Sequence, residues 1–254
     1  MPEAPSFSAQ YDAIIEQQLL RNFYGDSGYF NTGYWVPGTA SAVEACDHLM
    51  QRVAEGLPPG RRSVLDVGCG LGGSTRWLLS HFPGSRITAI NFSPRQTWRT
   101  QRRLPAVRCA VVDAAHLAFA DESFDTVIAV ESAFHFRTRR KFLEEAWRVL
   151  VPGRGALALT DILFTDPSAI GPGMVPAENQ VAGLEGYTTL LQETGFSEVR
   201  LVDATDECWG GFCTQLGNFI QRFDAGARLA YEPLLARLRT SCVGHYLLGW
   251  AVKR

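Results

Sequence analysis

Apolar and polar positions follow two different periods along this chain, and each period predicts a different kind of element. Short apolar runs rich in valine, isoleucine and alanine predict buried strands near residues 62–67, 86–91, 106–112, 124–130, 155–162, 197–203 and 243–252. Apolar positions three or four residues apart predict helices near residues 73–82, 94–103, 137–150, 186–194, 208–223 and 227–240. Strands that alternate with helices form parallel sheets covered on both faces, so the pattern predicts a doubly wound, mostly parallel α/β fold. Because the last apolar run follows a helix, we expect it to form an antiparallel edge strand.

A helical preface comes before the first predicted strand. Between residues 7 and 23 an apolar or aromatic residue recurs every four positions, which predicts one amphipathic helix with the face Phe7, Tyr11, Ile15, Leu19 and Phe23. Residues 24–38 combine turn residues with many aromatics, and residues 40–55 predict a second helix. We expect this preface to close over the sheet.

The first predicted strand leads directly into a glycine-rich turn. Residues 63–77 read SVLDVGCGLGGSTRW, which is typical of a strand, a tight turn and the start of a helix. Glycines permit the left-handed backbone of such a turn and let a ligand approach bare amides, while the helix directs its free N–H groups at the same place. Asp66 lies near the end of the strand, at the edge where open α/β sheets bind ligands.

Two cofactors compete for this turn. Gly68-x-Gly70-x-x-Gly73 formally fits the fingerprint of dinucleotide-binding folds. That fingerprint also requires an acidic residue about 20 positions further on, whereas the second predicted strand ends in Asn91. A carboxylate at Asp66 would repel a pyrophosphate, but it suits the ammonium and sulfonium of S-adenosylmethionine (SAM), which carries no phosphate. We therefore favour SAM over a nicotinamide cofactor.

Several segments at the right intervals resemble one family. The motif V-L-D-V-G-C-G-x-G-G-S closely resembles motif I of class I SAM-dependent methyltransferases. Residues 87–96, 112–119 and 123–136 resemble the segments at the ends of the family's second, third and fourth strands, and residues 137–153 resemble the helix and turn that follow. The resemblance covers about residues 20–165 and is strongest to small-molecule methyltransferases of the UbiE, tocopherol and sugar or polyketide tailoring type.

The resemblance implies a role for each matching position. In relatives an acid at the position of Asn91 binds the ribose hydroxyls, so here an amide would take over that contact. Asp113 would accept from the adenine amino group, with the amide of Ala114 beside the ring, and Tyr34 would close over the methionine end. The cofactor-binding residues that the resemblance implies are Tyr34, Asp66, Gly68, Gly70, Asn91, Phe92, Gln96, Asp113, Ala114 and Glu131.

One histidine stands just beyond the fourth predicted strand, where the methyl group should emerge. A neutral imidazole at His135 could take a proton from a hydroxyl, an amine or an activated carbon, so we predict His135 as the catalytic general base. The alternative is a histidine that only orders its loop or contacts the lid. We expect no metal site, because the five histidines are widely spaced and methyl transfer from a sulfonium needs none.

Under this interpretation the chain has four parts. We predict an N-terminal helical lid at residues 1–58 and a SAM-binding, Rossmann-like core at residues 59–164. A substrate cap at residues 165–242 would hold a proline- and glycine-rich insertion, the later helices and the sixth strand. Residues 243–254 would return to the core as its final strand.

Composition narrows the partners and the compartment. A net charge of −2 without a basic cluster argues against a nucleic-acid substrate, and the N/D-P-P-Y motif of many base methylators is missing. With no signal pattern, no apolar run of membrane length and six scattered cysteines, we expect a cytoplasmic protein with reduced thiols. A homodimer remains open.

The sequence thus predicts an enzyme that transfers the methyl group of SAM to a small organic acceptor in specialised metabolism and releases S-adenosylhomocysteine. We favour an O-methyl product, with N- or C-methylation close behind. One alternative keeps the SAM site without methyl transfer, as a methyltransferase-like fold that catalyses a cyclisation or serves as a binding scaffold.

Overall fold

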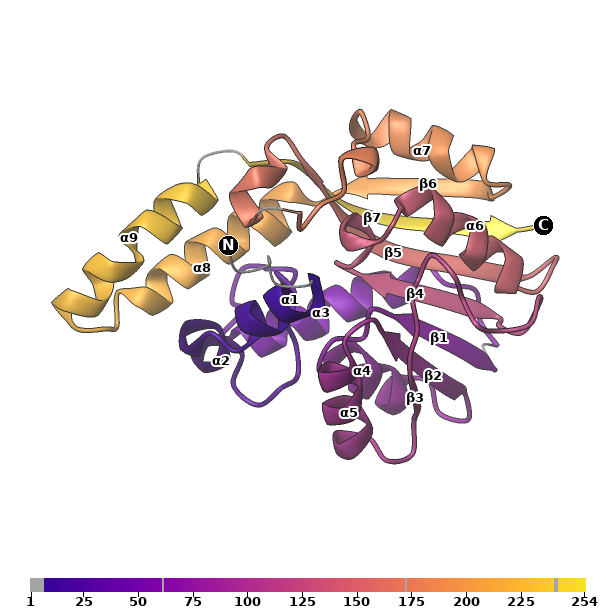
Figure 1. The fold of residues 1–254 in the computed structure, drawn as a ribbon, viewed down its shortest axis with the longest axis horizontal. Helices are drawn as coiled ribbons and strands as arrows, with labels where there is room; N and C mark the ends of the chain where they lie inside the picture. The colour runs from indigo at the N-terminus through magenta and orange to yellow at the C-terminus, as the bar shows by residue number, and fades with distance from the viewer. Residues whose placement is uncertain (1–6, 61, 172, 240–241) are drawn as a thin grey trace, which may run out of the picture.

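A mixed sheet with helices on both faces forms the centre of the molecule (Figure 1). The computed structural model describes residues 7–60, 62–171, 173–239 and 242–254, so the first six residues of the predicted lid and the end of the helix predicted over 227–240 lie outside the described residues. Among the described helices, none is long and apolar enough to cross a membrane. The architecture is the doubly wound α/β fold that the sequence predicts.

In the described part of the chain, seven strands form the sheet: β1 (Ser63–Val67), β2 (Arg86–Asn91), β3 (Arg108–Val111), β4 (Thr126–Val130), β5 (Gly155–Phe164), β6 (Ser197–Asp203) and β7 (Val243–Lys253). Their order is β3-β2-β1-β4-β5-β7-β6. The pairs among β1 to β5 are all parallel, whereas β7 runs antiparallel to both β5 and β6. All the parallel strands therefore end at the same edge.

The final strand is antiparallel as expected, but its predicted edge position is wrong. β7 lies between β5 and β6, and it pairs with β5 from Gly155 to Phe164. Its side chains are buried along most of its length, whereas those of β6 are alternately half-buried and exposed. A strand that is apolar on both faces belongs inside a sheet, so β6 takes the edge.

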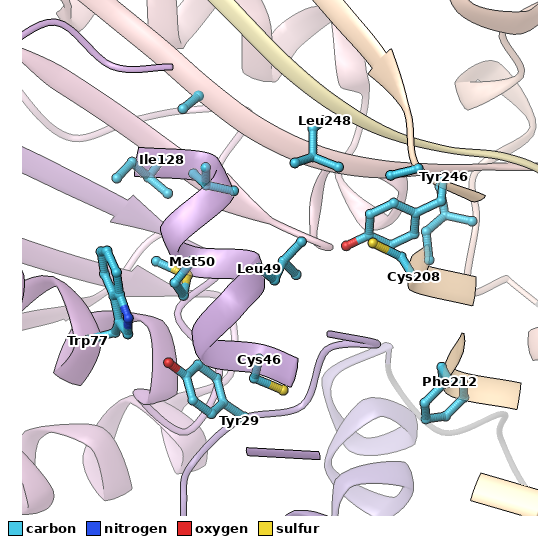
Figure 2. Packing of buried hydrophobic residues seen from close by; sticks show 14 of the residues in the cluster. Tyr29, Cys46, Leu49, Met50, Trp77, Ile128, Cys208, Phe212, Tyr246 and Leu248 are labelled. Atoms are coloured by element: carbon cyan, nitrogen blue, oxygen red, sulfur yellow. The ribbon is translucent and has the colours of Figure 1, made fainter. Parts of the chain in front are cut away.

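The helices that flank the sheet are α3 (Ala42–Glu55), α4 (Gly73–His81), α5 (Pro94–Arg103), α6 (Arg139–Val149) and α7 (Gly183–Glu193). Successive residues of β1 point to opposite faces, so Val64 packs in the cluster that contains α3 and α4, and Leu65 in the cluster that contains α6 and α7. Figure 2 shows Leu49 and Met50 of α3 near Leu248 of the sheet. Helices therefore pack against both faces of the sheet.

The lid contains the two helices α1 (Phe7–Ile15) and α2 (Gln18–Tyr24). The prediction of one continuous helix from residue 7 to residue 23 is wrong, because Gln17 leaves the helical region with a ψ of 128°. The break leaves Glu16 beside α5, where it pairs with Arg95 and Arg99. The apolar spacing of four continues across this break and therefore hides it in the sequence.

The cap follows β5 and contains the short turns η2 (Pro167–Ile170), η3 (Ala177–Asn179) and η4 (Asp206–Gly210) and the helices α8 (Gly211–Ile220) and α9 (Ala225–Arg239). α8 and α9 lie side by side and extend beyond the sheet on the same side as the lid helices (Figure 1). The helix predicted over 208–223 is α8, preceded by the π-helical turn η4.

Candidate active site

Two cavities meet where the parallel strands end. The first, here called the sheet cavity, has a volume of about 380 Å³ and is lined by residues at the ends of β1, β2, β3 and β4. The second, here called the cap cavity, has a volume of about 260 Å³ and lies between the lid, the end of β5 and the cap helices. Tyr11 and His135 line both cavities. These two side chains therefore mark the junction between the two spaces.

The sheet cavity is a mostly apolar slot with a few polar groups. Gly68 has a φ of +75°, and a Cβ at this position would lie 2.6 Å from the Cβ of Ser132, so only glycine fits. Phe92 lines the slot and keeps 51% of its surface exposed. Such a slot suits a flat heteroaromatic ring joined to a polar group. The remaining apolar lining comes from Val67, Ile90, Val112, Ala114 and Phe136.

A chain of hydrogen bonds fixes one polar group of the sheet cavity. Asn91 lines the cavity, and its Nδ2 donates to Oε1 of Gln96 at 2.8 Å. The Nε2 of Gln96 in turn donates to Oδ1 of Asp12 on α1 at 2.6 Å. Gln96 is buried and, among the described residues, is not part of the cavity lining. Its place in the structure is to orient Asn91 and to tie that amide to the lid.

A carboxylate lies in the sheet cavity just beyond β3. Asp113 and Ala114 both line the cavity. The Oδ1 of Asp113 accepts from the backbone N–H of Ala115 at 2.9 Å, which fixes the turn. A carboxylate held in this way can accept a hydrogen bond from an exocyclic amine in the slot.

Asp66 lies under the glycine turn and is 1% exposed. Its Oδ2 accepts from the hydroxyls of Ser74 and Thr75 at the start of α4, at 2.9 and 2.6 Å. Its Oδ1 has no hydrogen-bond partner in the described part of the chain. Burial raises the pKa of Asp66 to about 6, although the two hydroxyls act in the opposite direction. An orphaned, buried carboxyl oxygen beside an open turn is a feature that a cationic ligand would satisfy.

Five of the ten predicted cofactor-binding residues lie outside the lining of the sheet cavity: Asp66, Gln96, Glu131, Tyr34 and Gly70. Tyr34 has its ring 5.6 Å from the guanidinium carbon of Arg52 on α3, and its N–H bonds the carbonyl of Ala45. Gly70 has a φ of +55° and open space at its Cβ position, while its carbonyl accepts from the hydroxyl of Thr100. For both Tyr34 and Gly70 the predicted contact with the cofactor stays a prediction.

The cap cavity is enclosed by four segments that are far apart in the sequence. Its walls are predominantly aliphatic and aromatic, and its polar groups are few. The apolar lining comes from the lid (Tyr11, Ile14, Leu20, Tyr24, Phe30), from the turn after β4 (Phe134), from β5 and the turn after it (Ile162, Phe164, Ile170, Met174), and from the cap (Trp209, Phe212, Leu216, Leu234, Leu238). The polar lining comes from Gln17, Asn31, Thr32, Glu131, His135 and Arg237.

His135 ends a short turn, η1 (Ala133–His135), which is separated from β4 by Glu131 and Ser132. Its Nδ1 lies 2.6 Å from the carbonyl oxygen of Met174, so this nitrogen carries the proton and Nε2 is left as an acceptor. Burial lowers the pKa of His135 to about 4, against the bond to Met174, which acts in the opposite direction. The imidazole is therefore neutral throughout the physiological pH range.

Tyr11 is the site residue that sequence reasoning missed. Its ring meets that of His135 edge to face, with the centroids 5.1 Å apart, and it also contacts Phe30. The only signal in the sequence was its place on the apolar face of the first helix, which equally indicates packing. Contact with His135 depends on how the lid folds back over the sheet.

Known proteins similar to this chain support one family. A family model described as "Methyltransferase domain" matches residues 65–158. The chain is 33% identical over 214 residues to the 27-O-demethylrifamycin SV methyltransferase of Amycolatopsis mediterranei, an alignment that covers 77% of this chain and 75% of that protein. The chain belongs to the class I SAM-dependent methyltransferases. Its cofactor is accordingly SAM.

Two further known proteins are similar to this chain, one by sequence and one by structure. The chain is 35% identical over 206 residues to the erythromycin 3''-O-methyltransferase of Saccharopolyspora erythraea, over 71% of this chain and 66% of that protein. The chain thus spans about two thirds of the length of this relative. The solved structure of the [4+2]-cyclase SpnF superposes with a TM-score of 0.76 and 25% identity, over 98% of this chain and 97% of that one.

The residues of the sheet cavity fit SAM. Its slot of apolar side chains can hold the adenine ring, with the carboxylate of Asp113 able to accept from the amino group and the amide of Asn91 beside the ribose. Asp66, whose Oδ1 has no hydrogen-bond partner in the described part of the chain, lies outside the lining of this cavity, and its predicted contact with the methionine end stays a prediction. Of the ten predicted cofactor-binding residues, Gly68, Asn91, Phe92, Asp113 and Ala114 line the sheet cavity. Glu131, by contrast, lines the cap cavity.

Proposed function

We propose that this methyltransferase transfers the methyl group to a hydroxyl of a small, largely apolar specialised metabolite. The observation that carries the proposal is the junction at Tyr11 and His135, because an acceptor in the cap cavity would meet the cofactor there. The apolar walls of the cap cavity suit a hydrocarbon-rich acceptor. The two relatives above, whose names specify 3''-O and 27-O positions of natural products, support oxygen as the methylated atom.

The chain's own residues would align the acceptor and exclude water. When bound, SAM supplies a methyl group on a positively charged sulfur, which is already activated for transfer. The Nε2 of His135 can accept a hydrogen bond from the acceptor at the junction, since the proton on Nδ1 is held by the carbonyl of Met174. Tyr11 and Phe30 of the lid would close the space around this contact.

The proposal is tested by product mass. The purified chain is incubated with SAM and a panel of hydroxylated compounds that includes 27-O-demethylrifamycin SV, other desmethyl macrocyclic polyketides and simple phenols. We expect at least one compound to gain the mass of one methyl group, with fragments that place the methyl on oxygen. Methyl groups found only on nitrogen or carbon would contradict O-methylation.

A second candidate is a cyclisation in the SAM-bound enzyme without methyl transfer. It is supported by the superposition on the [4+2]-cyclase over nearly the whole of both chains. The same experiment distinguishes the two functions, because a cyclised product keeps the mass of its precursor. Retained SAM together with a product of unchanged mass would favour this candidate.

We also propose the setting in which the enzyme acts. All six cysteines are free thiols, which supports a reducing compartment such as the cytoplasm. The net charge of −2 gives no general attraction to nucleic acid or to anionic membranes. We further propose that the chain is organised as lid, core, cap and final strand. Analytical ultracentrifugation would test whether it forms a homodimer.

A further inference from the structure

Glu131 is held in an uncommon way between the sheet and the lid. It directly follows β4, and its φ of +46° lies in the left-handed region that residues other than glycine rarely adopt. Its Oε1 accepts from the N–H and the hydroxyl of Thr32 at 2.7 and 2.8 Å, and from the hydroxyl of Tyr246 at 2.7 Å. Three donors on one oxygen fix the orientation of the carboxyl group.

The other oxygen of Glu131 is available to a ligand. Within the described residues Oε2 has no hydrogen-bond partner, and Glu131 lines the cap cavity together with His135. The rest of this cavity is mostly apolar, so a polar group of a bound acceptor has few alternatives. A carboxyl oxygen in such surroundings is a strong hydrogen-bond acceptor.

The surroundings of Glu131 shift the pKa of its carboxyl group toward neutral pH. Burial raises the pKa of Glu131 to about 7, the bonds from Tyr246 and Thr32 oppose this, and the carboxylate of Asp161 adds to it. Burial also raises the pKa values of the surrounding phenols and thiols, so these stay neutral near pH 7. The titratable and charged groups that act on Glu131 or share its cavity are Tyr11, Tyr24, Cys46, His135, Asp161, Cys208, Arg237 and Tyr246.

We propose that Glu131 is the catalytic residue that takes the proton from the acceptor hydroxyl. As the acceptor oxygen bonds to the methyl carbon, the carbon–sulfur bond breaks with its electron pair passing to sulfur, and the hydroxyl proton passes to Oε2 of Glu131. This inference rests on the proposed O-methylation and names the proton acceptor of that same site. His135, neutral and with its pKa lowered to about 4, orients the hydroxyl but is a weak proton acceptor near pH 7.

The first test replaces the carboxyl with an amide. Glu131→Gln keeps the length of the side chain and an oxygen for the donors of Thr32 and Tyr246, but it cannot take a proton. We expect kcat to fall about 10²-fold or more at pH 8, with the Kd of SAM changed less than threefold. Glu122→Gln is the matched control, since Glu122 is an exposed glutamate with a φ of +58° and it should leave kcat unchanged.

The second test measures whether removing a donor to Glu131 shifts the dependence of kcat on pH. In the wild type we expect kcat to rise with pH through an apparent pKa near 7 and then to level. Thr32→Val and Tyr246→Phe each remove one donor that stabilises the charged carboxylate. In each variant the rise of kcat with pH, here called the limb, should therefore move to a higher apparent pKa by about half to one pH unit. A limb that stays in place in both variants, or that is lost in His135→Ala but kept in Glu131→Gln, would overturn the inference.

A third measurement does not need a methylated product. In the complex with S-adenosylhomocysteine, a carbon-13 carboxyl resonance of a glutamate should titrate with a midpoint near 7 and vanish in Glu131→Gln. A midpoint below 5 would refute the role even if the enzyme is active. If no compound of the panel is methylated, the proposed O-methylation fails, while this titration still decides whether Glu131 is poised to take a proton.

Discussion

At the scale of single residues, Asp66 links stability to the cofactor. Its pKa in the folded protein is raised by burial to about 6 from the ordinary value of 3.8. Below about pH 4 both folded and unfolded states are protonated, and no stability is lost. Between about pH 4 and pH 6 the unfolded state ionises while the folded state stays protonated, so the free energy of unfolding falls by up to about 3 kcal/mol and then levels above pH 6.

We predict that Asp66→Asn has opposite effects on stability and on cofactor binding. An amide oxygen can still accept from Ser74 and Thr75, and it carries no charge. The ligand-free variant should therefore melt higher than the wild type at pH 8, with the difference fading toward pH 4. The rise in Tm with SAM should be smaller than in the wild type, if the orphaned oxygen meets the ammonium or the sulfonium.

The matched control is Asp125, which lies at the other end of β1 and whose pKa is shifted in the opposite direction. Burial acts to raise the pKa of Asp125, but hydrogen bonds from Ser63 and Arg62 and the charge of Arg154 outweigh it, and the pKa is lowered overall. This carboxylate stabilises the fold above its unfolded pKa, so Asp125→Asn should lower Tm at pH 8. A rise in Tm for both variants, measured by calorimetry, would show that the effect at Asp66 is not electrostatic.

For His135 we predict a loss of rate without a change in the pH profile. His135→Ala should lower kcat by about 10²-fold on the acceptor found in the panel, because the hydroxyl loses its orienting partner. The limb near pH 7 should remain, since the pKa of His135 lies at about 4. His81→Ala, an exposed histidine on α4, is the control and should leave kcat unchanged. Loss of the limb in the His135 variant would restore the general-base role that the sequence suggests.

The sequence predicts which residues follow the strands better than it predicts what they touch. His135, Asp113 and Asn91 could be placed because the ends of parallel strands meet at one edge. The cavity that Glu131 faces could not be predicted, since its partners Thr32 and Tyr246 lie about a hundred positions away on either side. Such contacts are decided by how the elements pack and leave no local pattern.

At the scale of elements, one aspartate joins the lid to the core. Asp12 of α1 accepts from the hydroxyl of Ser93 at 2.9 Å and from Gln96, which holds the Asn91 amide in the sheet cavity. Closure of α1 and the orientation of Asn91 are therefore coupled. Nothing in the sequence indicates this link, because helix periodicity predicts which face is apolar but not which polar contacts form between elements.

We predict that Asp12→Ala loosens the lid and weakens cofactor binding. Loss of the charged acceptor should raise the Kd of S-adenosylhomocysteine about tenfold, measured by calorimetry. Tryptic cleavage after Arg21 in α2 should become faster, and the cofactor should slow it less than in the wild type. Asp26→Ala is the control, because this lid carboxylate is fully exposed and lies 3.6 Å from Arg103. Equal effects of the two variants would mean that lid charge, and not the Asp12 contact, matters.

At the scale of the whole molecule, the core lines most of the sheet cavity, whereas lid, core and cap together line the cap cavity. The strands that the sequence predicts build the sheet cavity almost alone, with Tyr11 as the lid's contribution. The cap cavity needs lid, β5 and cap together, and its shape follows from how α8 and α9 pack, which apolar spacing does not determine. The sequence therefore predicts that lid and cap segments surround the acceptor, but it does not predict which of their side chains form the walls.

The division predicts that the acceptor site can be blocked without loss of the cofactor site. Leu234 of α9 is half-buried and lines the cap cavity, so Leu234→Trp should fill part of its volume of about 260 Å³. We expect KM for the acceptor to rise at least tenfold while the Kd of SAM stays within twofold. Leu229→Trp on the same helix is the control, because Leu229 is 67% exposed and, among the described residues, no part of the cavity lining. If Leu234→Trp weakens SAM binding as strongly as it raises KM, the two cavities form one coupled site; if it changes neither, the acceptor binds elsewhere.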